Sequence, residues 1–209
     1  MKFYVCRTAP SPQRARILLA EKGIEVETIE IDLGQGEQLE EAFRQINPRC
    51  TVPVLELDDG TRLTENAGIS VYLEAIVPEP PMLGRSAEEK ALVATWNARV
   101  EVEGFLALAD AFRNRTKGMI DRAITGPTNY AQIPELAARG RARGDEFLDV
   151  LNDRLGESEY VASDAFSVAD ISAFVVCQFA KWVKLDATEG RPNTQRWIDL
   201  VSQRESLSS

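Results

Sequence analysis

The sequence predicts an α/β domain followed by an all-α domain, and three observations support this division. Over the first 77 residues, strand-like and helix-like segments alternate in the order β-α-β-α-β-β-α. The segment Pro78-Glu79-Pro80-Pro81 then interrupts the chain with prolines, which helix interiors and central strands exclude. Beyond it, long stretches keep helical spacing with few helix breakers. We therefore expect a first domain over residues 1–77, a linker over 78–85 and a helical domain over 86–209.

The elements of the first domain follow from short apolar runs between turn residues. The expected strands cover residues 2–6, 26–31, 53–57 and 61–64, and the expected helices cover 12–22, 39–46 and 67–76. Ser11 is a good N-cap with Pro12 at the first helical position, and Gly23 supplies a left-handed stop to this first helix. The turn Asp58-Asp59-Gly60 predicts a hairpin between the last two strands.

The second domain reads as a set of helices. Its expected helices cover residues 86–115, 134–155, 168–183 and 192–204. Before the third of these, Ser167 and Asp170 have the spacing of a capping box, in which two side chains satisfy main-chain donors at a helix start.

Composition excludes several classes of function. The net charge of −9 argues against a nucleic-acid or anionic-membrane partner, since phosphate binding requires clustered Lys and Arg. No apolar run approaches the roughly 20 residues that cross a bilayer, and the N-terminus does not resemble a signal peptide. The three cysteines, Cys6, Cys50 and Cys177, are odd in number and far apart, which indicates reduced thiols in a cytoplasmic protein.

The chain contains no histidine. This excludes Ser-His-Asp and Cys-His catalysis and the common zinc sites, so we expect no metal centre. Chemistry in this protein has to use hydroxyls, thiols, carboxylates, main-chain groups and the reactivity of the ligand itself.

Several motifs, in order and at the right spacing, resemble those of the cytosolic glutathione transferases of bacterial type. They are Ala20-Glu21-Lys22-Gly23-Ile24, Asn47-Pro48, Val52-Pro53-Val54-Leu55, Glu65-Asn66-Ala67-Gly68-Ile69 and Phe166-Ser167-Val168-Ala169-Asp170-Ile171. The resemblance covers essentially the whole chain. It implies a thioredoxin-like first domain that binds glutathione as co-substrate and a helical-bundle second domain that contributes the pocket for an electrophile.

The resemblance also implies a set of glutathione-binding residues. Pro53 would be a cis proline, and Val52 would pair its main-chain N–H and C=O with the cysteinyl part of glutathione. Glu65 and Asn66 would hold the γ-glutamyl end, with Asn66 standing where the family usually has Ser or Thr. Gln38 and Thr51 would contact the glycine end or the main chain, with Thr51 in place of a frequent Lys.

The residue that activates the glutathione thiol is expected at the start of the first helix, where it would stabilise the thiolate. Ser11 matches the position at which bacterial members carry Cys or Asn, while Ala9 occupies the position of the serine in the theta and phi classes. Ser11 is the leading candidate and Thr8 the second. Cys6 is a further alternative and would imply mixed-disulfide chemistry.

The electrophile pocket is expected to draw on the loop over residues 8–11 and on the helix from Trp96 to Phe112, with Phe105, Phe112 and Tyr130 as candidate wall residues. The resemblance implies a cytoplasmic homodimer that detoxifies small hydrophobic electrophiles by adding the glutathione thiolate. Two other functions remain open. One is a glutathione-dependent disulfide or peroxide reductase, and the other is a binding or regulatory protein that has lost thiol activation.

Overall fold

The computed structural model describes residues 1–208 and divides into two compact units. The first unit contains Met1–Pro80 together with the segment Ile124–Tyr130, and the second contains Pro81–Ala123 together with the chain from Ala131 onward. The boundary between Pro80 and Pro81 lies inside the linker expected over residues 78–85. The last residue of the expected helical domain, Ser209, lies outside the described residues.

The first unit has the predicted order of strands and helices. Its elements are β1 (Lys2–Val5), α1 (Pro10–Glu21), β2 (Glu27–Glu30), η1 (Glu37–Leu39), α2 (Glu41–Arg44), β3 (Val54–Glu56), β4 (Arg62–Leu63) and α3 (Asn66–Ile76). The sheet order is β2-β1-β3-β4, with β2 parallel to β1, and with β3 antiparallel to both β1 and β4. The helix expected over 39–46 is shorter than predicted and is preceded by the 3-10 turn η1.

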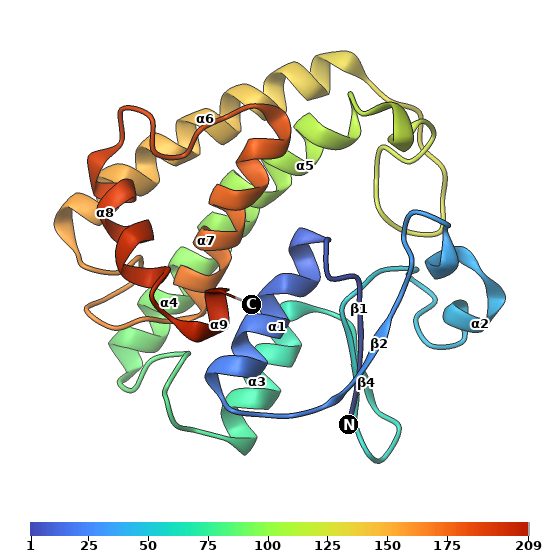
Figure 1. Cartoon of the computed structure of the whole chain (residues 1–209), viewed down its shortest axis with the longest axis horizontal. Coiled ribbons are helices and arrows are strands. Elements are labelled where there is room, and N and C mark those ends of the chain that lie inside the picture. The colour runs from blue at the N-terminus through green and yellow to red at the C-terminus, as the bar shows by residue number, and fades with distance from the viewer. Residues whose placement is uncertain (209) are drawn as a thin grey trace. The chain divides into compact units, whose positions relative to one another are not determined.

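The sheet of the first unit lies between two helical layers (Figure 1). On one face, Tyr4 of β1 packs edge-to-face against Phe43 of α2, with ring centroids 6.3 Å apart. Because side chains alternate along a strand, Phe3 and Val5 point to the other face, which α1 and α3 cover. All four side chains are buried. This arrangement brings the N-terminal ends of α1 and α3 into one region of the unit.

Helix α1 begins earlier than the sequence predicts. Its N-cap is Ala9 and its first residue is Pro10, and no side chain caps it. Ser11 is therefore the second helical residue, so the prediction that it caps the helix is wrong. The physical reason is that two prolines, Pro10 and Pro12, suit the first turn equally well, and the chain uses the earlier one. The stop at Gly23 is confirmed, with φ of 62°.

The second unit is helical. Its elements are α4 (Ala87–Arg99), the π-helical segment η2 (Val100–Phe105), α5 (Leu106–Arg113), η3 (Lys117–Met119), α6 (Pro134–Glu157), α7 (Val168–Ala180), η4 (Lys181–Val183), α8 (Pro192–Val201) and α9 (Glu205–Ser208). Helix α7 is buried along nearly its whole length. None of the helices in the described part of the chain combines the length and the apolar character needed to cross a membrane.

Glycines allow the helices of this unit to approach closely. A Cβ at Gly140 of α6 would lie 2.5 Å from the carbonyl oxygen of Ala107, and one at Gly104 would lie 2.7 Å from the ring of Phe147. Gly104 belongs to η2, so the predicted helix over 86–115 is interrupted by a π-helical segment where α6 packs against it. Such segments commonly redirect the side chains that follow them.

The predicted capping box at the start of α7 is confirmed. The side chain of Asp170 is fully buried and accepts hydrogen bonds from the main-chain N–H groups of Ser167 and Val161 and from the indole Nε1 of Trp197, at 2.9 to 3.0 Å. Burial raises the pKa of Asp170 to about 6, although these donors favour its charged form. The box therefore ties α7 to α8 as well as starting α7.

Candidate functional site

The N-terminal tip of α1 has one main-chain donor in its first three positions. Pro10 and Pro12 lack an N–H, and the N–H of Ala9 donates to the carbonyl oxygen of Cys6 at 3.0 Å. The N–H of Ser11 is therefore the donor that this tip presents. The positive end of the helix dipole lies at the same place, so the tip of α1 favours a negatively charged ligand.

The side chain of Ser11 is held by two other residues. The amide Nδ2 of Asn66, the first residue of α3, donates to the Ser11 Oγ and to the Ser11 carbonyl oxygen, both at 3.1 Å. A guanidinium Nη2 of Arg14 donates to the same Oγ at 3.3 Å, and Arg14 is buried. A carbonyl oxygen only accepts hydrogen bonds, so its contact with Asn66 also fixes which end of that amide faces Ser11.

These contacts determine what the Ser11 hydroxyl can do. A hydroxyl has two acceptor lone pairs and one proton, and Asn66 and Arg14 supply a donor for each lone pair. The hydroxyl proton remains available to donate to a third group. A nearby guanidinium also favours negative charge next to this hydroxyl. Ser11 is therefore arranged as a hydrogen-bond donor to an anion.

The two alternative activating residues lie in the loop before α1. The Sγ of Cys6 is 3.4 Å from the Oγ1 of Thr8, and the two groups share a hydrogen bond. Thr8 is exposed, whereas Cys6 is 8 % exposed. Cys50 and Cys177 are buried as well, and burial raises the pKa of Cys177 to about 12. Thr8 is thus accessible to a ligand, but part of its hydrogen-bonding capacity is used by Cys6.

The segment from Asn47 to Pro53 forms the loop before β3. The buried Asn47 donates from Nδ2 to the carbonyl oxygen of Thr51 at 2.8 Å and to its Oγ1 at 3.0 Å. The Val52–Pro53 peptide bond is cis, as the resemblance implies. The register of β1 with β3 ends at the pair Tyr4–Val54, so the main chain of Val52 lies beyond the ladder. This leaves Val52 at the end of a sheet, where an extended peptide is able to add.

The start of α3 combines two acceptors with main-chain donors. Glu65 is the N-cap residue and is exposed. The Oδ1 of Asn66 is buried and has no hydrogen-bond partner among the described residues. The Oε1 of Gln38, in η1, is also buried and lacks such a partner. These acceptors suit the ammonium and amide groups of a peptide ligand.

In the second unit, two of the three predicted wall residues belong to one aromatic cluster. Phe112 lies against Phe179 and Trp182, with ring centroids 5.9 and 5.1 Å away, and Phe105 lies 5.5 Å from Phe179. Tyr130, by contrast, belongs to the first unit and is half exposed.

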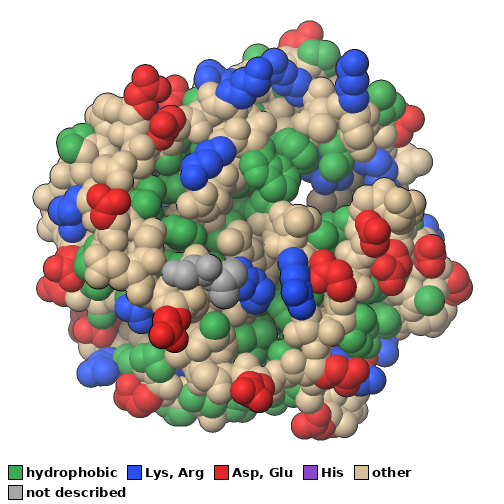
Figure 2. Space-filling model, in the orientation of Figure 1, with side chains coloured by type: hydrophobic (Ala, Val, Ile, Leu, Met, Phe, Trp, Pro, Cys, Tyr) green, Lys and Arg blue, Asp and Glu red, His purple; other side chains and the backbone are tan. Residues whose placement is uncertain are grey.

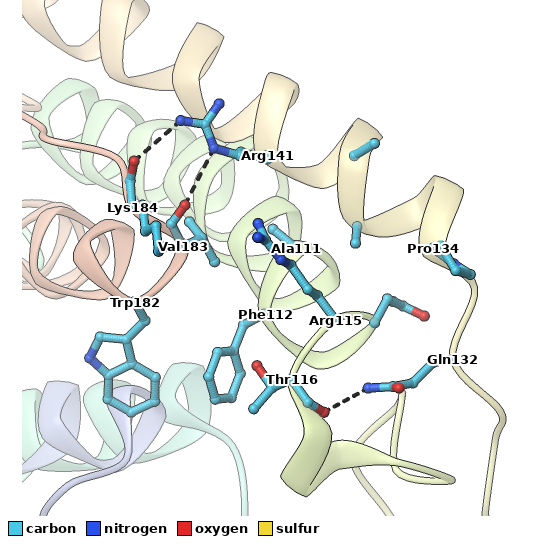
Figure 3. A pocket seen from close by; sticks show the side chains of 13 residues that line it. Ala111, Phe112, Arg115, Thr116, Gln132, Pro134, Arg141, Trp182, Val183 and Lys184 are labelled. Atoms are coloured by element: carbon cyan, nitrogen blue, oxygen red, sulfur yellow. Dashed lines mark hydrogen bonds between the residues drawn. The ribbon is translucent and has the colours of Figure 1, made fainter.

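A cavity of about 740 Å³ opens beside this cluster (Figure 3). Phe112 lines it, while Phe105 and Tyr130 are not among its lining residues. The described residues that line it are Ala111, Phe112, Asn114, Arg115, Thr116, Gln132, Pro134, Ala137, Ala138, Arg141, Trp182, Val183 and Lys184.

Sequence reasoning missed several residues of these sites. Arg14 was not predicted, although a basic residue three positions after Ser11, one helical turn away, is a usable signal. The role of Asn47 as the support of Thr51 was hidden in the Asn-Pro motif. The cationic residues that line the cavity, Arg115, Arg141 and Lys184, come from three distant segments, so no local pattern indicates them. Within the described residues, no group of three or more Cys, Asp or Glu side chains is arranged to hold a metal ion.

Comparisons with known proteins define the class. The model of the glutathione S-transferase N-terminal domain matches residues 8–76, and that of the C-terminal domain matches residues 134–200. Glutathione S-transferase 2 of Saccharomyces cerevisiae is 34% identical over 99% of this chain and 88% of its own length. The chain therefore belongs to the glutathione S-transferase family, with a thioredoxin-like first domain and a helical second domain.

Two solved bacterial structures place it more closely within the family. A glutathione S-transferase domain-containing protein of Marinobacter aquaeolei VT8 is 34% identical, with a TM-score of 0.91 over 99% of this chain and all of its own. A class Gtt2 glutathione S-transferase of Vibrio parahaemolyticus is 36% identical, with a TM-score of 0.83 over this whole chain and 96% of its own. The chain is thus a Gtt2-like member, of a family that uses glutathione.

Proposed function

We propose that this protein adds the thiolate of glutathione to an electrophilic carbon of a small hydrophobic molecule. The observation that carries the proposal is the Ser11 hydroxyl, whose two lone pairs are occupied by donors from Asn66 and Arg14. Its proton, together with the Ser11 N–H and the positive end of α1, would stabilise a thiolate over a thiol. The thiolate is the nucleophilic form, so this stabilisation raises its concentration near neutral pH.

The remaining residues of the first unit would hold the tripeptide. The carboxylate of Glu65 and the buried Oδ1 of Asn66 would accept from the γ-glutamyl ammonium, and main-chain donors at the start of α3 would bind its carboxylate. Val52, beside the cis Pro53, would pair with the cysteinyl main chain. Gln38 and Thr51 would contact the glycine end, with Thr51 held by Asn47.

The reaction balances without a further reactant. The glutathione thiol gives its proton to solvent, the sulfur forms a bond to the electrophilic carbon, and the leaving group departs with its bonding electron pair. In an addition to a double bond, a proton from solvent completes the product instead. The aromatic cluster around Phe112 and Phe105 would supply the apolar surface for the electrophile. We also propose that the protein acts as a cytoplasmic homodimer, with Tyr130 as a further wall residue.

The test combines glutathione titration with two activity assays on wild type, Ser11→Ala and Thr8→Ala. One assay follows conjugation to 1-chloro-2,4-dinitrobenzene, and the other follows reduction of a small disulfide by glutathione. Losing one preorganised donor should lower kcat/KM for conjugation by about a hundredfold in Ser11→Ala. Thr8→Ala should remain within about threefold of wild type, since the Thr8 hydroxyl is shared with Cys6.

Each alternative predicts a different result. Disulfide reduction exceeding conjugation would favour the reductase, and glutathione binding without turnover in either assay would favour a regulatory protein. Conjugation that survives Ser11→Ala but not Thr8→Ala would transfer the activating role to Thr8.

A further inference from the structure

One segment between α5 and α6 belongs to the first unit, although the chain on either side of it belongs to the second. We call this segment, Ile124–Tyr130, the strap. Within the strap, Gly126 is buried, whereas its neighbours Thr125 and Pro127 are exposed. Gly126 is therefore a point at which the strap lies against the rest of the first unit.

Gly126 contacts the loop that precedes β3. A Cβ built on Gly126 would lie 3.7 Å from the carbonyl oxygen of Arg49, which is an ordinary van der Waals distance. The φ of Gly126 is 121°, a value that residues with a side chain rarely adopt. The backbone conformation of the strap, rather than a lack of space, therefore requires glycine where the strap meets Arg49.

The chain is held on both sides of the strap. Before the strap, the carbonyl oxygen of Arg122 accepts a hydrogen bond from the Nη2 of Arg113. After it, the Nε2 of Gln132 donates to the carbonyl oxygens of Arg113 and Thr116, at 2.7 and 2.8 Å. A short segment with both ends fixed has fewer conformations than a free loop, so less entropy is lost when the strap packs in one place.

The loop that the strap contacts, Asn47–Pro53, contains a strained residue. Cys50 has φ of 55°, in the left-handed region that residues other than glycine seldom adopt. Such a conformation persists only where the surrounding structure holds it. Asn47 holds the loop from inside, since its Nδ2 donates to the carbonyl oxygen of Thr51 at 2.8 Å and its Oδ1 accepts from the N–H of Arg49 at 3.0 Å. The strap meets the same loop from outside, at the carbonyl oxygen directly before Cys50.

Binding of glutathione by this loop would depend on main-chain positions. Thr51 stands where the family often has Lys, so its side chain offers a hydroxyl instead of a positive charge. Figure 2 shows acidic side chains gathered over the region of η1 and α2, which precedes the loop, and these do not attract the glycine carboxylate. The N–H and C=O of Val52 would then carry much of the contact, and hydrogen bonds require narrow ranges of distance and angle. A small displacement of the loop would therefore weaken binding.

We propose that the strap holds the Asn47–Pro53 loop in the conformation that binds the cysteinyl and glycyl parts of glutathione. The inference rests on the proposed function, because the residues that the strap positions are those proposed to bind glutathione. Gly126 is the positioning residue of the strap, and it acts through the main chain of Arg49. The strap has no part in activating the thiol, which is the role proposed for Ser11.

Three variants test this role. Gly126→Ala adds a methyl group that meets Arg49 at an ordinary distance, so its effect arises from the disfavoured φ. Gly118→Ala is the matched control, because Gly118 lies in η3, in the same connection between α5 and α6, and a Cβ there would meet no atom within 4 Å. Pro127→Gly loosens the strap at an exposed position, so it leaves the buried core intact.

Hydrogen exchange of the free protein, followed by mass spectrometry, reports the loop directly. Amide exchange over residues 48–53 should be faster than in wild type in Gly126→Ala and Pro127→Gly, and unchanged in Gly118→Ala. Calorimetric titration with glutathione should give a dissociation constant raised by about threefold to tenfold in Gly126→Ala and by about twofold in Pro127→Gly, because the competent loop conformation is less populated. At saturating glutathione, kcat for conjugation should stay within about twofold of wild type.

Unchanged exchange over residues 48–53 in Gly126→Ala would overturn the proposal, as would an equal loss of glutathione affinity in Gly118→Ala. A fall in kcat with unchanged affinity would overturn it as well, since the strap would then act on the reaction and not on binding. A wild-type protein that does not bind glutathione would instead refute the proposed function. The exchange comparison needs no ligand, so it would still decide whether the strap holds the loop.

Discussion

The Nδ2 of Asn66 lies 3.1 Å from both the Oγ and the carbonyl oxygen of Ser11, which is 55 positions earlier in the chain. The contact joins the first turn of α3 to the first turn of α1. It gives Asn66 a role different from the direct ligand role that the family resemblance implies for its side chain. The amide nitrogen orients Ser11, and only the buried Oδ1 is left for the ligand.

Replacing Asn66 by Asp tests this orienting role with nearly the same shape. A carboxylate cannot donate, so the Ser11 hydroxyl would turn to donate to Asp and would no longer face the thiol. We expect kcat/KM for conjugation to fall by about tenfold to a hundredfold, and the pKa of bound glutathione in the pH–rate profile to rise.

The stability of Asn66→Asp distinguishes a changed orientation of the Ser11 hydroxyl from a general loss of folding. A carboxylate at the first position of α3 interacts favourably with the helix dipole, which offsets part of the lost hydrogen bond to the Ser11 carbonyl oxygen, so the free energy of unfolding of Asn66→Asp should fall by no more than about 2 kcal/mol. An unchanged pH–rate profile in a folded variant would show that Asn66 does not orient the activating hydroxyl.

Lys22 ties the end of α1 to the end of the first unit. Its side chain is fully buried, and Nζ donates to the carboxylate of Glu74 and to the carbonyl oxygens of Val77 and Pro80. Lys22→Met would remove the buried donor from the carbonyl oxygens of Val77 and Pro80 and the positive charge beside Glu74, so we expect a loss of about 2 to 4 kcal/mol in urea unfolding. Lys2→Met, at an exposed position of β1, should change stability by less than about 0.5 kcal/mol. Equal effects at the two sites would contradict this account.

Asp170 gives the stability of the second unit a pH dependence. Its pKa is about 6 in the folded chain, above the value near 3.9 of an unfolded Asp. Between these two values the folded chain binds more protons, so the Asp170 contribution to stability is full below pH 4 and is lost as the pH rises through 6. Between pH 5 and 7.5 the loss is about 1 to 1.5 kcal/mol.

The comparison of wild type with Asp170→Asn isolates this contribution, because every other group titrates in both proteins. Wild type should be more stable than the variant by a margin that narrows as the pH rises from 5 to 7.5. A margin that stays constant or widens over this range would mean that the folded pKa is not raised.

Much of the fold was predictable because its signals are local. The alternation of elements, the hairpin at Asp58-Asp59-Gly60, the stop at Gly23 and the capping box at Ser167 each depend on a few neighbouring residues. The start of α1 was misplaced by an equally local ambiguity between two prolines. Contacts between distant residues, such as the hydrogen bond from Trp197 to Asp170, were not predictable from local patterns.

The candidate site also combines features that local motifs predict with features that depend on contacts between distant residues. The Val52–Pro53 and Glu65–Asn66 motifs indicated a glutathione frame, but the contact between Asn66 and Ser11 requires two helix starts to meet in space. The inclusion of Ile124–Tyr130 in the first unit likewise has no local signal in the sequence. The cavity cations, at positions 115, 141 and 184, converge only through the packing of three helical segments.

Gly140 of α6 lies directly against the backbone of α5, and this contact gives a prediction about packing. A Cβ at Gly140 would lie 2.5 Å from the carbonyl oxygen of Ala107 and 2.7 Å from the main-chain N of Ala111. Both contacts are to main chain, which cannot move aside as a flexible side chain does. We therefore expect Gly140→Ala to destabilise the protein by about 1 to 3 kcal/mol in urea unfolding, through overpacking.

Gly68→Ala provides the matched control within a helix. Gly68 lies in α3, and a Cβ there would meet no atom within 4 Å. Alanine restricts the unfolded chain and favours helix, so this variant should gain about 0.5 to 1 kcal/mol. The two substitutions add the same methyl group to a helical glycine, and opposite signs are expected because only one site is closed by a neighbouring backbone. If both variants were stabilised, α5 and α6 would have to be farther apart than the Gly140 contacts indicate.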